Sequence, residues 1–187
     1  HTKSNTLIRG CKNSVIPPSV TEIWDWAFSD YSSLTSISIP ESVTMIGDWA
    51  FNGCSSLTSI SVPESVTMIG DFAFSGCSSL TSISIPESVT EIGEEAFSGC
   101  SSLTSIVVSK DNKVYDSRED CNAIIHTESN TLIRGCENTI IPPSVTMIGD
   151  SAFFDCKSLT SISIPPSVTE IGDFAFSACS SLTSISI

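Results

Sequence analysis

The chain has 187 residues, of which 40% are hydrophobic and 16% charged, and its net charge of −13 gives an isoelectric point near 4.2. This acidic balance disfavours nucleic-acid backbones and anionic membranes as partners, and the sequence has no apolar run of membrane-spanning length. We therefore expect no nucleic-acid partner and no direct membrane contact for this fragment. No linker divides the sequence, so residues 1–187 are expected to form one elongated domain.

A 23-residue unit recurs from Leu34 onward, as LTSISIPESVTMIGDWAFNGCSS, LTSISVPESVTMIGDFAFSGCSS and LTSISIPESVTEIGEEAFSGCSS. A fixed period of this length is typical of a solenoid, in which each coil buries its apolar side against its neighbours. The alternation of serine with Ile37 and Ile39 predicts a parallel strand with one buried face, which a proline then ends. The following S-V-T-x-I-G-D-x-A-F segment predicts a short helix on the convex side, with Ile46 inward and Asp48 at its N-cap. The expected fold class is therefore α/β.

The repeat is interrupted once. Seven spacings separate successive strand ends, and six of them are 23 residues, whereas the spacing from Val108 to Ile141 is 33. In the longer coil, the runs NAII and NTLI flank a polar HTES, which predicts a β-hairpin projecting from the solenoid within an insert at about 109–140. The segment from His1 matches the segment from His126, so we expect the chain to be a fragment of a longer array whose uncapped ends permit end-to-end self-association.

The eight cysteines form two groups. Five of them share one repeat position, which Tyr31 takes in an earlier coil, so they are expected to be buried free thiols and not metal ligands. They are Cys54, Cys77, Cys100, Cys156 and Cys179. If the hairpin turns at Glu128 and Ser129, residues whose numbers add to 257 face each other, and this register predicts a disulfide between Cys121 and Cys136. Such a bond would place the protein in an oxidising, extracellular compartment.

The pattern L-x-x-I-x-I-P-x-S-V-T-x-I-G-D-x-A-F-x-x-C-x-x-L resembles the BspA-like class of leucine-rich repeats, and the match covers nearly the whole chain. The resemblance implies a right-handed leucine-rich-repeat solenoid with a parallel concave β-sheet, short convex helices and an inserted β-hairpin. It also implies a secreted or bacterial cell-surface protein, with adhesion to an extracellular host or bacterial surface protein as the expected role. One departure is Trp24, which replaces the regular glycine of the repeat.

Two surfaces are candidates for binding. The first, here called the serine face, consists of outward strand residues, and it either solvates the sheet or presents a hydroxyl array to a glycan. Its candidate residues are Ser36, Ser38, Ser59, Ser61, Ser82, Ser84, Ser161 and Ser163. The second, here called the aromatic row, precedes each A-F dipeptide, and it is either a stabilising ladder or a contact surface. Its candidate residues are Trp26, Trp49, Phe72 and Phe174.

Catalysis has no support in the sequence. Both histidines, His1 and His126, fall at the same polar position beside a threonine, and the sequence contains no phosphate-binding glycine loop and no H-E-x-x-H motif. We therefore expect a protein without enzymatic activity, cofactor or metal. A cell-surface adhesion or protein-interaction module is the favoured function, and a passive structural spacer is the alternative.

Overall fold

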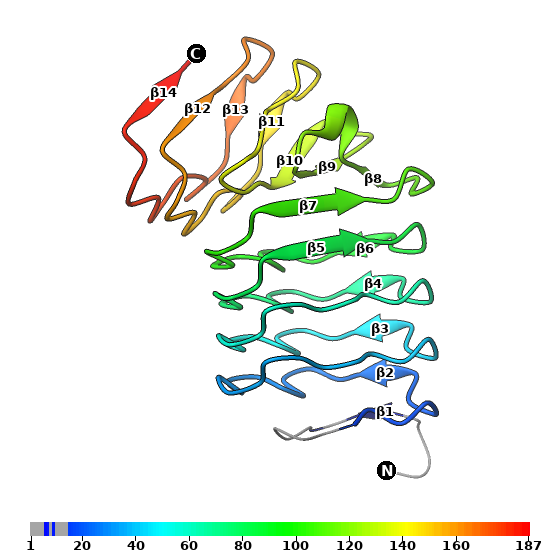
Figure 1. Cartoon of the computed structure of the whole chain (residues 1–187). Coiled ribbons are helices and arrows are strands. Elements are labelled where there is room, and N and C mark those ends of the chain that lie inside the picture. Colours follow the sequence, from blue (N-terminus) through cyan, green and yellow to red (C-terminus); the bar gives the residue numbers. More distant parts are fainter. Residues whose placement is uncertain (1–5, 8, 10–14) are drawn as a thin grey trace.

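A computed structural model describes residues 6–7, 9 and 15–187. It is a β-solenoid whose N-terminal coils stack as nearly parallel layers, whereas the C-terminal coils are turned away from them (Figure 1). We call residues up to 108 the N-terminal arm, residues 109–140 the insert and residues 141–187 the C-terminal arm. The insert lies at the bend between the two arms, which we call the elbow (Figure 1).

The longest ladders are formed by the T-x-I segments. In the N-terminal arm, a five-stranded parallel sheet has the order β1-β2-β3-β4-β6. Its strands are β1 (Thr6–Leu7), β2 (Glu22–Ile23), β3 (Met45–Ile46), β4 (Met68–Ile69) and β6 (Glu91–Ile92). Ile46 is fully buried, as the periodicity indicated, but it belongs to a strand and not to a helix.

The predicted convex helices are absent from the described residues, where the G-D-x-A-F segments form consecutive turns. The one helical element there is a three-residue 3-10 helix, η1 (Arg118–Asp120). Asp48 does not cap its own helix, because its Oδ1 accepts the backbone N–H of Asp71 in the next coil at 2.9 Å. The aspartate row therefore links one coil to the next. No helix in this part of the chain is long and apolar enough to cross a membrane.

The serine strands pair in parallel, as predicted, but they do not form one continuous ladder. β5 (Ser82–Ile85) pairs with β7 (Ser105–Val108), and β12 (Ser161–Ser163) pairs with β14 (Ser184–Ser186). Earlier in the chain a single parallel bridge joins Ser36 to Ser59. The prediction of one ladder through all coils is wrong, because the insert separates β7 from β12.

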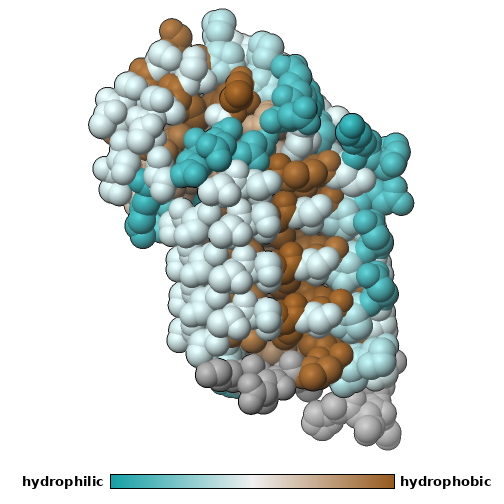
Figure 2. Space-filling view, viewed as in Figure 1, coloured by the Kyte–Doolittle hydropathy of each residue, from teal (hydrophilic) through white to brown (hydrophobic). Residues whose placement is uncertain are grey.

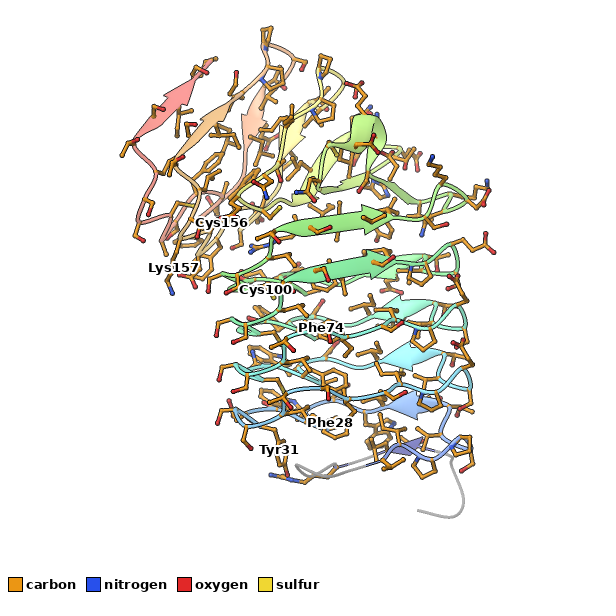
Figure 3. All side chains as sticks on the ribbon, viewed as in Figure 1. Phe28, Tyr31, Phe74, Cys100, Cys156 and Lys157 are labelled. Carbon is orange, nitrogen blue, oxygen red and sulfur yellow. The ribbon has the colours of Figure 1, made fainter. Side chains whose placement is uncertain are left out.

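The core of the N-terminal arm is a stack of phenylalanine rings. The rings of Phe28, Phe51, Phe74 and Phe97 stack with planes within 3° of parallel, at centroid separations of 5.1, 5.3 and 5.5 Å. Figure 3 shows Phe28 and Phe74 pointing into the interior between the two ladders. A second stack, Phe153 on Phe176, lies in a separate core cluster of the C-terminal arm. The elbow therefore divides the expected single core.

The insert is built into the stack and does not project from it, which corrects the expected hairpin. Its strands β8 (Tyr115–Asp116), β9 (Ile124–His126) and β10 (Thr131–Arg134) form an antiparallel meander. β10 then pairs in parallel with β11 (Met147–Ile148), which pairs with β13 (Glu170–Ile171). Ile124, Ile125 and Leu132 are fully buried, so the insert supplies part of both cores.

Polar side chains of the insert take over hydrogen bonds that a further coil would have made. Asn112 donates to the carbonyls of Pro86 and Val89 at 2.8 and 2.9 Å. Tyr115 Oη accepts the N–H of Ile92 at 2.9 Å. Asn122 Oδ1 accepts the N–H of Ile106 at 2.6 Å, and its Nδ2 donates to the carbonyl of Thr104 at 2.8 Å. These side chains close much of the open edge of the N-terminal arm.

Candidate functional site

Three members of the aromatic row stack along the N-terminal arm, as the coil spacing predicts. The ring centroids of Trp26 and Trp49 are 4.8 Å apart with planes 1° apart, and those of Trp49 and Phe72 are 4.2 Å apart with planes 18° apart. Phe174 does not join them, because Glu95 and Ser151 take the intervening positions and the elbow lies between the arms. The structure therefore brings together three of the four predicted residues.

Stacking covers both ring faces of Trp49 and one ring face each of Trp26 and Phe72. Trp26 is 55% exposed, and Trp49 and Phe72 are half-buried, since each shares a ring face with a neighbour. Trp24, two residues before Trp26, is 48% exposed and is a further exposed aromatic side chain of the same coil. Sequence reasoning noted Trp24 only as a departure from the repeat and missed it as a candidate.

Every residue of the row has a left-handed backbone conformation. The φ angle is 61° at Trp26, 58° at Trp49 and 53° at Phe72, and it has the same sign at Glu95, Ser151 and Phe174. For residues with a Cβ this conformation costs about 1–2 kcal/mol, and glycine or asparagine fits it better. Stacking contributes about 0.5–1.5 kcal/mol per pair, so strain and stacking are of similar size. Because stacking only offsets the backbone strain, a gain in folding stability does not by itself explain why large aromatic residues occupy these positions.

The structure also explains why Trp24 replaces the regular glycine. A Cβ at Gly47 would lie 2.4 Å from Asp25 Oδ1 and 2.8 Å from the Asp25 nitrogen, so this position has no room for a side chain. The coil before Trp24 contains β1, and the β1–β2 register places Arg9 where the aspartate would be. Because no aspartate of the preceding coil occupies this space, the side chain of Trp24 is accommodated.

The serine face is polar and exposed. All eight predicted serines are exposed, and Figure 2 shows a pale field of weakly polar side chains along the N-terminal arm. The neighbouring hydroxyls of Thr58, Thr81 and Thr104 each donate to a carbonyl of the preceding coil at 3.2–3.3 Å. The face therefore offers single hydroxyls and few large anchors, whereas aromatic and arginine side chains dominate binding energy in protein interfaces.

One apolar exception on the serine face lies at the elbow. Val107 replaces serine in the outward row and is 52% exposed. It lines a groove of about 730 Å³ between β7 and η1, together with Lys110 and Asn138. The sequence signal for this groove is the single change from serine to valine in the alternating strand.

The repeated cysteines are packed thiols, as predicted. The Sγ of Cys54 donates to the carbonyl of Phe28 at 3.1 Å, and Cys77 repeats this bond to Phe51 at 3.2 Å. Burial raises the pKa of the Cys54 thiol to about 12 and that of Cys100 to about 11, and it raises the pKa of Cys77 as well. These thiols are therefore protonated at neutral pH and unsuited to nucleophilic chemistry.

The predicted disulfide between Cys121 and Cys136 is wrong, because both cysteines are buried free thiols. Strand pairing follows the sum of 257 at Thr131↔His126 and Leu132↔Ile125, but a bulge then shifts the register so that Arg134 faces Ile124. Beyond that bulge Cys136 meets Asn122, whose Nδ2 donates to its Sγ at 3.2 Å. Cys11, which corresponds to Cys136 in the super-repeat, lies outside the described residues.

Among the residues that the structure describes, no group of three or more His, Cys, Asp and Glu side chains is placed to hold a metal ion. The carboxylates of the insert are engaged elsewhere. Asp116 forms an ion pair with Arg118 at 2.6 Å and accepts the hydroxyl of Thr127 at 2.9 Å. The local structure of this acidic loop is therefore explained by contacts within the chain.

Comparison with known proteins shows the family. The model of the BspA type leucine rich repeat region matches six copies over residues 8–121 and 129–187, so this chain belongs to that family. The members of this family are leucine-rich-repeat proteins, which include bacterial surface antigens. No curated protein matches the chain.

Solved structures share the fold. A leucine rich cell surface protein from Faecalibacterium prausnitzii is 32% identical with a TM-score of 0.73, over 90% of this chain and 52% of that one. A leucine-rich repeat protein from Bacteroides ovatus is 34% identical with a TM-score of 0.59, over 96% and 39%. The pneumococcal vaccine antigen PcpA is 24% identical with a TM-score of 0.78, over 90% and 43%. The chain thus spans about half, or less, of each of these proteins.

Proposed function

We propose that this chain is the protein-binding part of a secreted or surface-attached bacterial protein, and that the aromatic row with Trp24 is its contact surface. The observation that carries the proposal is the partly exposed stack of Trp26, Trp49 and Phe72 at left-handed backbone positions. An aromatic stack that ends on the exposed Trp26 is unusual on a surface made mainly of serine and threonine, and aromatic anchors are the commonest hot spots of protein interfaces.

A protein partner fits the row better than a glycan does. Sugars pack against free aromatic ring faces, but here most ring faces are covered by the next ring of the stack. The exposed edges and the neighbouring Trp24 instead suit apolar side chains of a folded protein. The relatives that are described as a cell surface protein and a vaccine antigen support an extracellular location for this chain. Adhesion to a host or bacterial surface protein is the role we propose.

The experiment uses the purified chain on an array of extracellular matrix proteins, bacterial surface proteins and glycans. Replacing Trp26, Trp49 and Phe72 together by serine should abolish protein binding while circular dichroism remains unchanged, since Ser151 already takes this position at a φ of 52°. The matched control is Phe174→Ser, which removes an aromatic side chain of the same repeat position outside the stack and should leave binding intact.

Two other outcomes identify other functions. If the triple variant still binds but changing Ser59, Ser61, Ser82 and Ser84 to lysine abolishes binding, the serine face is the site. Loss of glycan capture in that variant would point to the hydroxyl array. If wild-type protein captures nothing on the array, the chain is better described as a passive spacer.

A further inference from the structure

A second cavity lies at the elbow, where Glu95 and Ser151 continue the repeat position of the aromatic row beyond Phe72. It has a volume of about 260 Å³ and is enclosed by residues 92–98 of the last regular coil and by Ile133, Arg134 and residues 149–151. Cys100 and Cys156 lie on the two sides of this junction (Figure 3). The cavity occupies the place where the turns of one more regular coil would have stacked.

The wall of the N-terminal arm presents hydrogen-bond donors without acceptors. In the preceding coil, the N–H groups of Phe72, Phe74 and Gly76 donate to carbonyls of the next coil at 2.8–2.9 Å. The corresponding N–H groups of the last regular coil belong to Glu95, Phe97 and Gly99. Within the described part of the chain, these three N–H groups have no acceptor. The insert caps the other edges of the arm with Asn112, Tyr115 and Asn122, but it supplies no acceptor here.

The facing wall contributes a further donor. Arg134 is 3% exposed, and its Nη1 donates to the carbonyls of Ser151 and Phe154 at 3.3 and 3.1 Å. Its Nη2 has only a weak contact of 3.7 Å to the Sγ of Cys156, and its Nε–H has no partner. Neither described salt bridge includes this buried cation. Leaving a buried charged donor without an acceptor is unfavourable.

A small acceptor with a single charge suits this cavity best. The Nε and Nη2 edge of a guanidinium matches the two oxygens of a carboxylate. The walls also include Ile92, Ala96 and Phe97, which suit a short alkyl group. Glu94, Glu95 and Asp150 line the same cavity, so a dianion such as phosphate is disfavoured by repulsion.

We propose that the elbow cavity binds a small organic monocarboxylate, with its oxygens on Arg134 and on the backbone N–H groups of Glu95 and Phe97. The alkyl part lies against Phe97 and Ile133. Binding would connect the N-terminal arm to the insert at the elbow, because Glu95 and Phe97 belong to the arm and Arg134 belongs to β10 of the insert.

The direct test is amide NMR of the wild-type chain titrated with butyrate, acetate and phosphate. The amide signals of Glu95 and Phe97 should shift and saturate together. Butyrate should bind up to about fifteenfold more tightly than acetate, since each buried methylene contributes about fourfold, and phosphate should bind least. Absence of saturable shifts at these amides with butyrate overturns the proposal.

Variants separate the site from general effects of the ion. Arg134→Gln should weaken butyrate binding at least about tenfold, whereas Arg118→Gln, which alters an arginine already paired with Asp116, should leave the affinity unchanged. Equal loss in both variants would refute a role for Arg134. If Arg134→Gln does not fold, the wild-type amide shifts still decide the question.

The chain's own carboxylate is the remaining competitor. Glu95 is exposed and lines the cavity, so removing its charge by Glu95→Gln should strengthen butyrate binding. Binding that occurs only in Glu95→Gln would show that Glu95 itself fills the cavity, which overturns the proposal. These measurements need no protein partner, so their outcome is independent of the function proposed for the aromatic row.

Discussion

The glycine before each aspartate gives a sharp test of how the coils are joined. A Cβ at Gly70 would lie 2.4 Å from Asp48 Oδ1 and 2.7 Å from both the Asp48 nitrogen and the Gly47 carbonyl carbon. At Gly149 the nearest atom would be the Leu132 oxygen at 3.1 Å, because β10 carries no capping aspartate at this point. The same glycine-to-alanine change should therefore have very different effects at the two positions.

The magnitude follows from what each alanine displaces. Gly70→Ala forces Asp48 Oδ1 away from the N–H of Asp71, a bond to a charged group that contributes about 1.5–3 kcal/mol. The overlap with backbone atoms adds about 1–3 kcal/mol, as in an overpacked core. We therefore expect a loss of about 3–5 kcal/mol. Gly149→Ala should change the free energy of unfolding by less than about 1 kcal/mol, because it displaces no hydrogen bond.

The assay is urea unfolding at equilibrium, followed by circular dichroism, with thermal unfolding as a second measure. For a chain of this size 1 kcal/mol corresponds to about 2–4 °C, so Gly70→Ala should lower Tm by at least about 6 °C. Asp48→Ala removes the hydrogen bond without the backbone overlap and should have an intermediate effect. Equal losses for Gly70→Ala and Gly149→Ala, or a larger loss at Gly149, would refute the explanation.

Two further outcomes can be checked on the same protein. Asn122→Ala should destabilise the chain by about 1–3 kcal/mol in urea unfolding, because it leaves the N–H of Ile106 unpaired and removes the shorter of two bonds to the Thr104 carbonyl. Asn138→Ala, which removes only the longer bond of 3.3 Å to that carbonyl, should cost less than about 1 kcal/mol. Comparable losses would contradict the edge-capping role. Stability should fall as the pH rises above about 8, since burial raises the pKa of the Cys54 thiol from 9.0 to about 12 and the unfolded chain loses this proton first. At pH 10 each such thiol should reduce the free energy of unfolding by about 1.4 kcal/mol, and a stability that is flat from pH 8 to 10.5 would disprove this linkage.

Much of this protein follows from its sequence. The 23-residue period determines a solenoid with one strand position per coil, because each coil buries the same apolar positions against the next. The match between the segments at His1 and His126 indicates equivalent local structure, and β1 and β10 indeed pair with their neighbours in the same register. The position shared by Cys54 and Tyr31 marks a packing site, and the spacing of Trp26, Trp49 and Phe72 predicts a stack.

Other features depend on contacts between coils, which a single repeat does not contain. Asp48 is an equally good acceptor for its own helix or for the next coil, and only the 23-residue stacking places the N–H of Asp71 at its Oδ1. The bulge between Leu132 and Arg134 changes the partner of Cys136, since a one-residue shift in register turns a predicted disulfide into a contact with Asn122. The cavity at Arg134 exists because the insert replaces a regular coil with strands of different spacing. The unpaired donors arise where the insert meets the last regular coil, and their positions are decided by tertiary structure.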